Sequence, residues 1–161
     1  MSAAQLNKLI NRLNGLYDFV VAEVDNKIDK NRQLFVEQNQ AQLVETGARS
    51  DRESVEYLFP RKTPTNSSGA YTLPYSRYKQ STGGTTAYVD LYDQGDFNQS
   101  IVLLKEGVGS WKFSSVNVKF KWLRVAYGDE ILGVNDTFLD KYCESDMKPH
   151  LEKKINNYLF K

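Results

Sequence analysis

Apolar residues recur every three or four positions along the first third of the chain, which is the spacing of an amphipathic helix. Glycine suits the left-handed position after a last helical turn, so Gly47 marks the end of this segment, and Ser2 is a suitable N-cap. We therefore predict a long helix over residues 3–46, with Gly15 as its weak point because glycine costs about 1 kcal/mol relative to alanine. The apolar positions are Leu6, Leu9, Ile10, Leu13, Leu16, Val20, Val24, Ile28, Leu34, Phe35 and Leu43.

An unbroken helix of this length would extend beyond its own domain. Residues 3–46 at about 1.5 Å per residue would span about 66 Å, whereas a compact chain of this size has a diameter of about 40 Å. The helix therefore either breaks, near Gly15 or around Asp25 and Asn26, or packs against another subunit. Its second half, residues 31–42, is rich in amide side chains, which suit either a hydrated subunit contact or a solvated face.

Residues 47–87 have the composition of an extended loop, with prolines at 60, 64 and 74 and paired glycines at 83 and 84. Such a long loop in a compact domain is usually functional or disordered. No acidic residue occurs between Tyr57 and Val89. Tyrosine and arginine are enriched at interface cores, so this loop is predicted to contact a partner protein, with single-stranded nucleic acid or plain loop packing as alternatives. Six of the ten tyrosines lie between residues 57 and 92, in this loop and just after it: Tyr57, Tyr71, Tyr75, Tyr78, Tyr88 and Tyr92.

Antiparallel strands are predicted within residues 87–118, at 87–91, 99–104 and 110–118. Gly107 and Gly109 favour a hairpin between the last two. Residues 119–160 are predicted to be helical. The first helix ends at Gly128, and the last begins at a cap formed by Asn135 or Asp136 and is kinked or split at Pro149. The order predicts a single α+β domain over residues 1–161: a long N-terminal helix, a long loop, a small antiparallel sheet of about three to four strands, and C-terminal helices.

Charge and composition exclude several classes of protein. The chain has 161 residues, 21 of them basic and 20 acidic, so a dedicated nucleic-acid binder is disfavoured. One cysteine and one histidine exclude an internal disulfide and a multi-histidine metal site. No segment has the roughly 20 apolar residues of a membrane helix, and the start of the chain lacks the pattern of a secretory signal. We expect a protein of the cytosol or of a particle assembled there.

The residues that could carry catalysis do not form a recognisable pattern. Cys143 and His150 are seven positions apart, which is about 10.5 Å of helical rise and beyond hydrogen-bond reach. Asp90, Asp93 and Asp96 lack the ligand spacing of a calcium-binding loop, so we interpret them as a polar turn. The sequence thus predicts no enzyme activity, no cofactor and no metal site.

The segment Tyr75-Ser-Arg-Tyr-Lys79 is followed by Val89-Asp-Leu-Tyr-Asp-Gln-Gly-Asp-Phe97-Asn-Gln-Ser100. Two further segments are Lys119-Phe-Lys-Trp-Leu123 and Tyr127-Gly-Asp-Glu-Ile-Leu-Gly133-Val-Asn-Asp136. These four segments resemble small morphogenesis proteins of tailed phages, including versions from phages of gut Bacteroidetes, although Gln94 stands where the family usually has threonine. The resemblance runs from about residue 33 to the C-terminus, and the N-terminal helix is matched in kind rather than by motif.

The resemblance implies a virion structural protein at the head–tail junction, of the tail-completion or neck type. Such a protein would assemble as a ring in the host cytoplasm, join tail tube or connector proteins in the virion, and perform no catalysis. The alternative is a monomeric cytosolic module that binds protein or nucleic acid, although direct nucleic-acid contact is disfavoured by the charge balance. The predicted partner interface comprises Tyr71, Tyr75, Arg77, Tyr78 and Lys79, with Asp93 and Gly95 shaping the adjoining turn.

Overall fold

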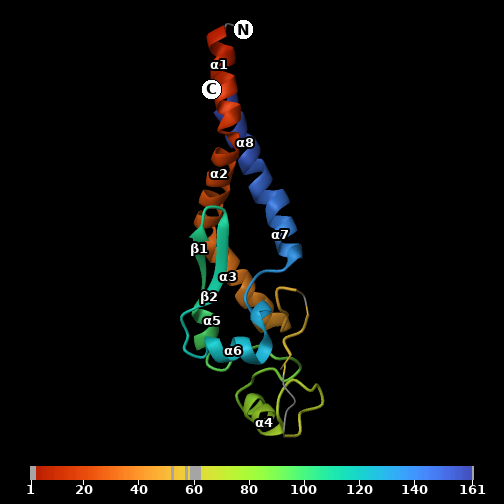
Figure 1. Cartoon of the computed structure of the whole chain (residues 1–161). Helices are drawn as coiled ribbons and strands as arrows, with labels where there is room; N and C mark the ends of the chain where they lie inside the picture. The colour runs from red at the N-terminus through yellow and green to blue at the C-terminus, as the bar shows by residue number, and fades with distance from the viewer. Residues whose placement is uncertain (1–2, 52, 57, 59–62, 161) are drawn as a thin grey trace.

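The computed structural model describes residues 3–51, 53–56, 58 and 63–160. The predicted N-cap Ser2, and Tyr57 and Pro60 of the predicted loop, lie outside these residues. The molecule is elongated, with α1 (Ala3–Asn14) and the C-terminal part of α8 (Lys148–Phe160) at one end and α4 (Leu73–Ser81) at the other (Figure 1). The mixture of helices with an antiparallel sheet confirms the predicted α+β class. None of the helices in the described ranges is both long and apolar enough to cross a membrane.

The predicted N-terminal helix is present as consecutive pieces. After α1 come α2 (Leu16–Lys30), α3 (Arg32–Ala41) and a π-helical turn, η1 (Gln42–Thr46). The break predicted at Gly15 is confirmed, and a Cβ there would lie only 2.9 Å from the Tyr158 hydroxyl of α8. The second break falls at Asn31 rather than at Asp25 and Asn26, because Asp25 is buried within α2 against the β-hairpin.

Gly47 ends this helical segment as predicted. Its φ of +62° lies in the left-handed region, which a residue with a Cβ adopts only with strain. The Tyr88 ring packs directly on Gly47, where a Cβ would overlap it. The Tyr88 hydroxyl donates to the carbonyl oxygens of Val44, at 3.0 Å, and Glu45, at 2.7 Å. Tyr88 therefore satisfies carbonyls that the end of a helix leaves unpaired.

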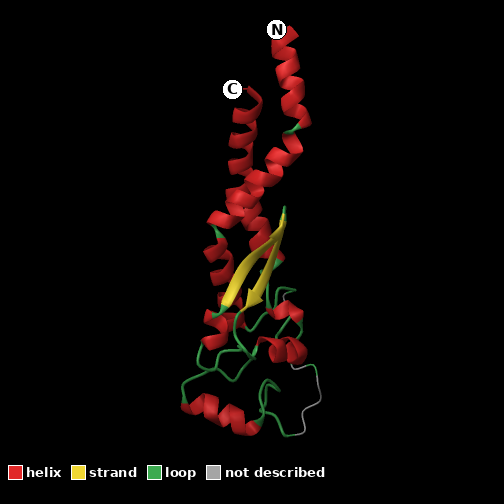
Figure 2. Ribbon diagram, turned by 60° about the vertical axis from the view of Figure 1, so that its left-hand side comes forward, coloured by secondary structure: helices red, strands yellow, loops and turns green. Residues whose placement is uncertain are grey.

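The sheet is a single hairpin in the described part of the chain. Strands β1 (Ile101–Gly107) and β2 (Ser110–Ser115) pair antiparallel with Leu103 opposite Phe113, and Figure 2 shows the hairpin alongside the helices. The prediction of three to four strands is wrong, because residues 87–91 are not a strand. Their polar groups bond to side chains instead: the Asp90 amide donates to the Tyr71 hydroxyl at 3.1 Å.

The C-terminal region is helical, as predicted. It contains α6 (Phe120–Tyr127), η2 (Asp129–Ile131), α7 (Asp136–Tyr142), the π-helical turn η3 (Cys143–Met147) and α8. Asn135 is the N-cap, since its side chain accepts a hydrogen bond from the Phe138 amide at 3.0 Å. Pro149 does not split the last helix: η3, immediately before α8, absorbs the distortion that a missing amide and a bulky ring cause.

Part of the amide-rich segment 31–42 is used inside the molecule, so both predicted alternatives, a hydrated subunit contact and a solvated face, are wrong for Asn39 and Gln42. The Asn39 side chain is fully buried and donates to the carbonyls of Ile131, at 3.2 Å, and Gly133, at 2.8 Å. The Gln42 amide also donates to the Gly133 carbonyl, at 2.7 Å. These bonds fasten the segment after α6 to α3 and η1. The surrounding apolar core includes Phe35, Leu43, Phe97, Ile101, Ile131 and Tyr142.

Candidate functional site

The predicted loop over residues 47–87 contains a helix, and the prediction of an extended segment is therefore wrong at residues 73–81. Helix α4 begins after Thr72 and carries Pro74 in its first turn. Proline is favoured there because the first amides of a helix have no intrahelical partner and the ring fixes a helical φ. From the sequence alone, Pro74 is one of the prolines that indicate a loop. Ser76 and Lys79 form the buried side of α4.

Lys79 and Asp90 form a buried ion pair that fastens α4 to the segment at residues 89–93. The Lys79 Nζ lies 2.8 and 3.0 Å from the two Asp90 carboxylate oxygens, and the side chains are only 4% and 7% exposed. Lys79 also donates to the Tyr92 carbonyl, and the Tyr71 hydroxyl donates to Asp90 Oδ1 at 2.7 Å. A buried pair with additional hydrogen bonds is strongly sensitive to the loss of either partner.

The tyrosines of this region form a row of neighbouring rings. Tyr71 and Tyr75 have ring centroids 5.3 Å apart, and Tyr75 and Tyr78 are 5.7 Å apart. Burial and the hydrogen bond to Asp90 raise the pKa of Tyr71 far above its ordinary value. Burial, together with the neighbouring Asp93, raises the pKa of Tyr75 to about 12. Both hydroxyls therefore remain neutral hydrogen-bond donors at physiological pH.

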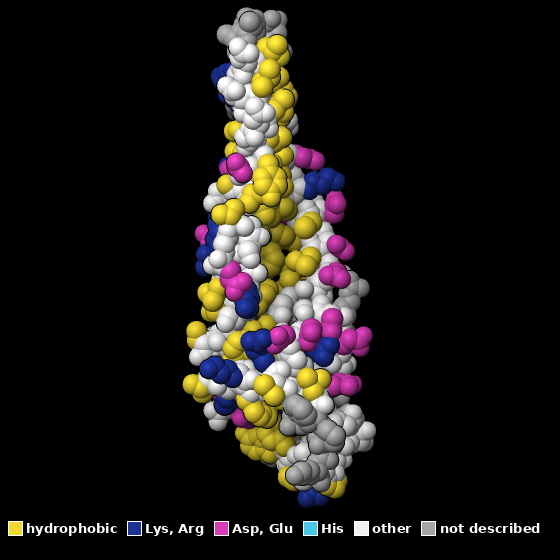
Figure 3. All heavy atoms as spheres, viewed as in Figure 1, with side chains coloured by type: hydrophobic (Ala, Val, Ile, Leu, Met, Phe, Trp, Pro, Cys, Tyr) yellow, Lys and Arg dark blue, Asp and Glu magenta, His cyan; other side chains and the backbone are white. Residues whose placement is uncertain are grey.

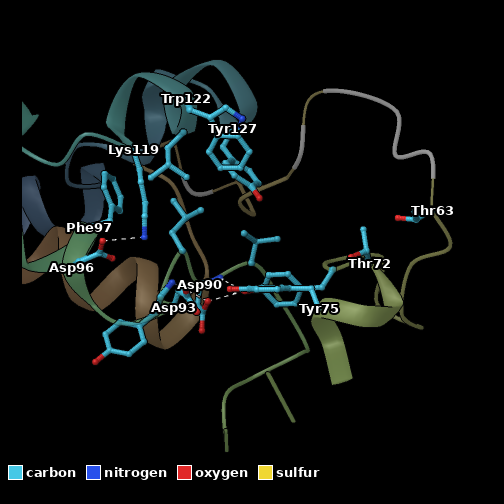
Figure 4. A pocket seen from close by; sticks show the side chains of 15 residues that line it. Thr63, Thr72, Tyr75, Asp90, Asp93, Asp96, Phe97, Lys119, Trp122 and Tyr127 are labelled. Atoms are coloured by element: carbon cyan, nitrogen blue, oxygen red, sulfur yellow. Dashed lines mark hydrogen bonds and ion pairs between the residues drawn. The ribbon is translucent and has the colours of Figure 1, made fainter. Parts of the chain in front are cut away.

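A cleft of about 710 Å³ lies between α4, the segment at residues 89–93, α5 (Asp96–Gln99) and α6 (Figure 4). Tyr75 lines it from α4, while Trp122 and Tyr127 line it from α6, with their rings 6.2 Å apart and perpendicular. Other lining residues are Thr63, Tyr71, Thr72, Val89, Asp90, Leu91, Tyr92, Asp93, Asp96, Phe97, Lys119 and Leu123. We refer to it as the aromatic cleft.

The carboxylates of the aromatic cleft differ in their pairing. Asp90 is paired with Lys79, and Asp96 lies 3.0 Å from the Lys119 Nζ, which lowers the Asp96 pKa. Asp93 is exposed and has no ion pair among the described residues; its contact is with the Tyr75 hydroxyl, whose pKa it raises. The cleft thus offers aromatic faces and an available carboxylate, a combination that attracts a cationic side chain.

The structure gives the predicted interface residues different positions. Tyr71 and Lys79 are buried, and their contacts with Asp90 hold the segment together, although the Tyr71 ring also forms part of the wall of the aromatic cleft. Tyr75 and Asp93 line the aromatic cleft.

The remaining predicted residues lie outside the cleft. Arg77 and Tyr78 are exposed on the outer side of α4. Gly95 has a φ of +79° and precedes α5, where a Cβ would press on the Tyr92 ring. Gly95 therefore shapes a turn, but this turn leads into α5 and not directly into the strand that the sequence predicted there.

Sequence reasoning missed the roles of Asp90, Trp122 and Tyr127. A signal for Asp90 was present, because it is the first acid after the acid-free residues 57–89 and is the nearest counter-charge for a lysine there. No comparable signal placed α6 across the cleft from α4, since the two helices are far apart in the chain.

The remaining candidate groups lie elsewhere and serve other contacts. His150 Nε2 lies 3.1 Å from Glu23 Oε2, which links α8 to α2, and Cys143 is exposed. The described residues contain no group of three or more His, Cys, Asp or Glu side chains placed to hold a metal ion. Comparison of the chain with protein-family models, curated proteins and solved structures finds no match.

Proposed function

We propose that this chain is a virion structural protein of a tailed phage, of the tail-completion or neck type. It acts at the head–tail junction, assembles as a ring, and joins tail tube or connector proteins. The observation that carries the proposal is the aromatic cleft, which lies within the part of the chain that resembles phage morphogenesis proteins. The proposed role is structural and involves no cofactor.

The aromatic cleft has the properties of a protein-docking site. Aromatic side chains bury a large area while losing few rotamers, and they dominate the energetics of interfaces. Its α4 wall is held in place by the buried pair of Lys79 and Asp90, so binding would require little ordering of the site. Asp93 adds a carboxylate beside the aromatic faces. The occupant we propose is a segment of the neighbouring virion protein that carries an arginine or lysine side chain.

The elongated shape supports a joining role. The aromatic cleft lies near the α4 end of the molecule, whereas α1 and the end of α8 lie at the opposite end (Figure 1). Two surfaces at opposite ends allow one copy to contact a partner protein and a second copy at the same time. Contacts between copies close into rings when they are heterologous and the rotation between copies permits it.

The test is to purify mature phage particles from the host and to locate this chain in them by mass spectrometry and labelled electron microscopy. The proposal predicts that the chain remains with particles after washing in high salt, and that the label lies at the junction of head and tail. A chain that is absent from particles, or that lies only in the capsid shell, would contradict it. Retention of the free chain on nucleic acid in a salt-sensitive manner would favour the monomeric binding module.

A further inference from the structure

The stalk formed by α1 and the C-terminal part of α8 carries an uncovered apolar face. We define the stalk seam as Leu6, Ile10, Leu13 and Tyr17, whose side chains are 49%, 45%, 51% and 78% exposed. In Figure 3 apolar side chains follow the stalk down to the body of the molecule. Single exposed apolar residues are ordinary on protein surfaces, but a continuous stripe marks an interaction site.

The stalk seam is distinct from the side of the helix that packs on α8. Arg12 of α1 donates to the Leu159 carbonyl at 2.9 Å, and Phe19 of α2 stacks on Tyr158 with ring centroids 4.1 Å apart. These contacts fix the orientation of the stalk. They leave the seam on a different side, so α8 does not cover it.

The spacing of the seam is that of a coiled coil. Its residues are separated by four, three and four positions, and the same alternation continues to Val20 and Val24. Leu6, Ile10 and Leu13 lie on α1, whereas Tyr17 follows the break at Gly15 and begins the α2 part of the stripe. This is the 3.5-residue repeat with which two helices interlock their side chains. At Val24 the stripe packs against the core of the molecule, whereas at the stalk seam the same stripe has no cover.

We propose that the occupant of the stalk seam is the stalk of a second copy of this chain, lying parallel and in register. With Ile10 at position a and Leu13 at position d of a heptad, the flanking e and g positions are Asn7, Leu9, Asn14 and Leu16. None of these is charged, so identical helices meet without like-charge repulsion across the seam. The two charged residues, Lys8 and Arg12, fall at the outer positions f and c. The inference rests on the proposed function, because it supplies one of the contacts between copies. This contact is isologous and pairs two copies, so a ring is built from such pairs through a second contact.

The seam alone is too small for a stable contact, so the surface beside it must take part. A large aromatic side chain buries about 250 Å² at most. Three of the four seam side chains are only about half exposed, so the area that they can bury together is below the roughly 800 Å² per partner of a standard interface. The seam leads into a depression of about 700 Å³ between α2 and the tip of the hairpin. Its lining combines apolar side chains, among them Val20, Val21 and Val108, with the polar side chains of Asp18, Asp25, Asn26 and Lys105. Val108 is 84% exposed there. The second copy therefore contacts the hairpin tip as well as the stalk.

The test compares the native mass of the full chain with that of two matched variants by sedimentation equilibrium. The wild-type chain is expected at two or more times 18.5 kDa. Ile10→Glu, which places a charge in the seam, should weaken self-association by at least about tenfold, whereas Asn11→Glu, at an outer position, should leave it unchanged. Far-ultraviolet circular dichroism checks that both variants keep the helical content of the wild type.

A cross-link tests the register independently of any loss of folding. In a Cys143→Ser background, Ile10→Cys should form a disulfide-linked dimer on oxidation, because identical a positions face each other in a parallel pair, and Asn11→Cys should not. A wild-type mass of 18.5 kDa, an Ile10→Glu variant that associates like the wild type, or cross-linking by Asn11→Cys alone would overturn the inference. The location of the chain in phage particles is measured separately, so the proposed function can stand when the stalk contact fails.

Discussion

The indole Nε1 of Trp111 donates a hydrogen bond to Asp25 Oδ1 at 2.9 Å, joining the hairpin to the middle of α2. The other carboxylate oxygen of Asp25 accepts from the Gly109 amide at 3.1 Å and lies 2.7 Å from the Lys105 Nζ. One buried carboxylate therefore holds the turn, the first strand and the second strand of the hairpin. A hairpin of two strands is marginally stable by itself, so this attachment to a helix determines whether it forms.

Asp25→Asn is predicted to remove an acid-dependent part of the stability. Lys105, the Gly109 amide and Trp111 lower the Asp25 pKa from 3.8 to about 2. A lowered folded-state pKa contributes stability that is complete above the ordinary pKa and is lost as the pH falls toward 2. Urea unfolding between pH 2 and pH 5, followed by tryptophan fluorescence, should therefore show a decline in the wild type that is smaller in Asp25→Asn. Asp18→Asn, at an exposed position of the same helix, should behave as the wild type.

Lys79→Met is predicted to destabilise the protein by about 3–5 kcal/mol, because it leaves the Asp90 carboxylate buried without its counter-charge. Lys79→Met combined with Asp90→Leu should cost less than the sum of the two single substitutions. Chemical denaturation of all four proteins gives the coupling energy directly. If the free-energy costs of the two single substitutions sum to the cost of the double substitution within about 0.5 kcal/mol, the two side chains do not act as a pair.

Trp122→Ala is predicted to reduce incorporation of the chain into phage particles while leaving its stability within about 0.5 kcal/mol of the wild type. The Trp122 side chain is largely exposed, so its loss removes a wall of the aromatic cleft without opening the core. Val125→Ala is the matched control, since Val125 is also exposed on α6 but does not line the cleft. Particles from complemented hosts can be compared for the amount of each variant. Equal incorporation of Trp122→Ala and Val125→Ala would count against the cleft as the docking site.

Gly47→Ala is predicted to lower the melting temperature more than Gly69→Ala. Both glycines have left-handed φ values, +62° and +73°, so alanine costs about 1–2 kcal/mol of backbone strain at either position. Only at Gly47 does the new Cβ also meet the Tyr88 ring, whereas the space beside Gly69 is open. Differential scanning calorimetry separates the two contributions. Equal shifts would show that Tyr88 moves aside without cost.

The sequence by itself determined the elements whose signals lie within a few neighbouring residues. The apolar stripe from Leu6 to Leu43, the stop at Gly47 and the cap at Asn135 all act through local backbone geometry, and the structure has each of them where the pattern predicts. The turn at Gly95 and the break at Gly15 belong to the same class. These features need no knowledge of the rest of the molecule, because a cap or a left-handed turn is satisfied by its own segment.

Only the tertiary structure decided how polar and apolar groups far apart in the chain are matched. Asn39 has the composition of a solvated face but is buried, because the carbonyls of Ile131 and Gly133 lie opposite it. The sequence predicts Lys79 as an interface residue, whereas in the structure it is the buried partner of Asp90. One apolar stripe is covered at Val24 and bare at Ile10, although the spacing is the same. Periodicity fixes which side chains share a face, whereas burial depends on whether another segment reaches that face, and the body of this molecule ends before the stalk does.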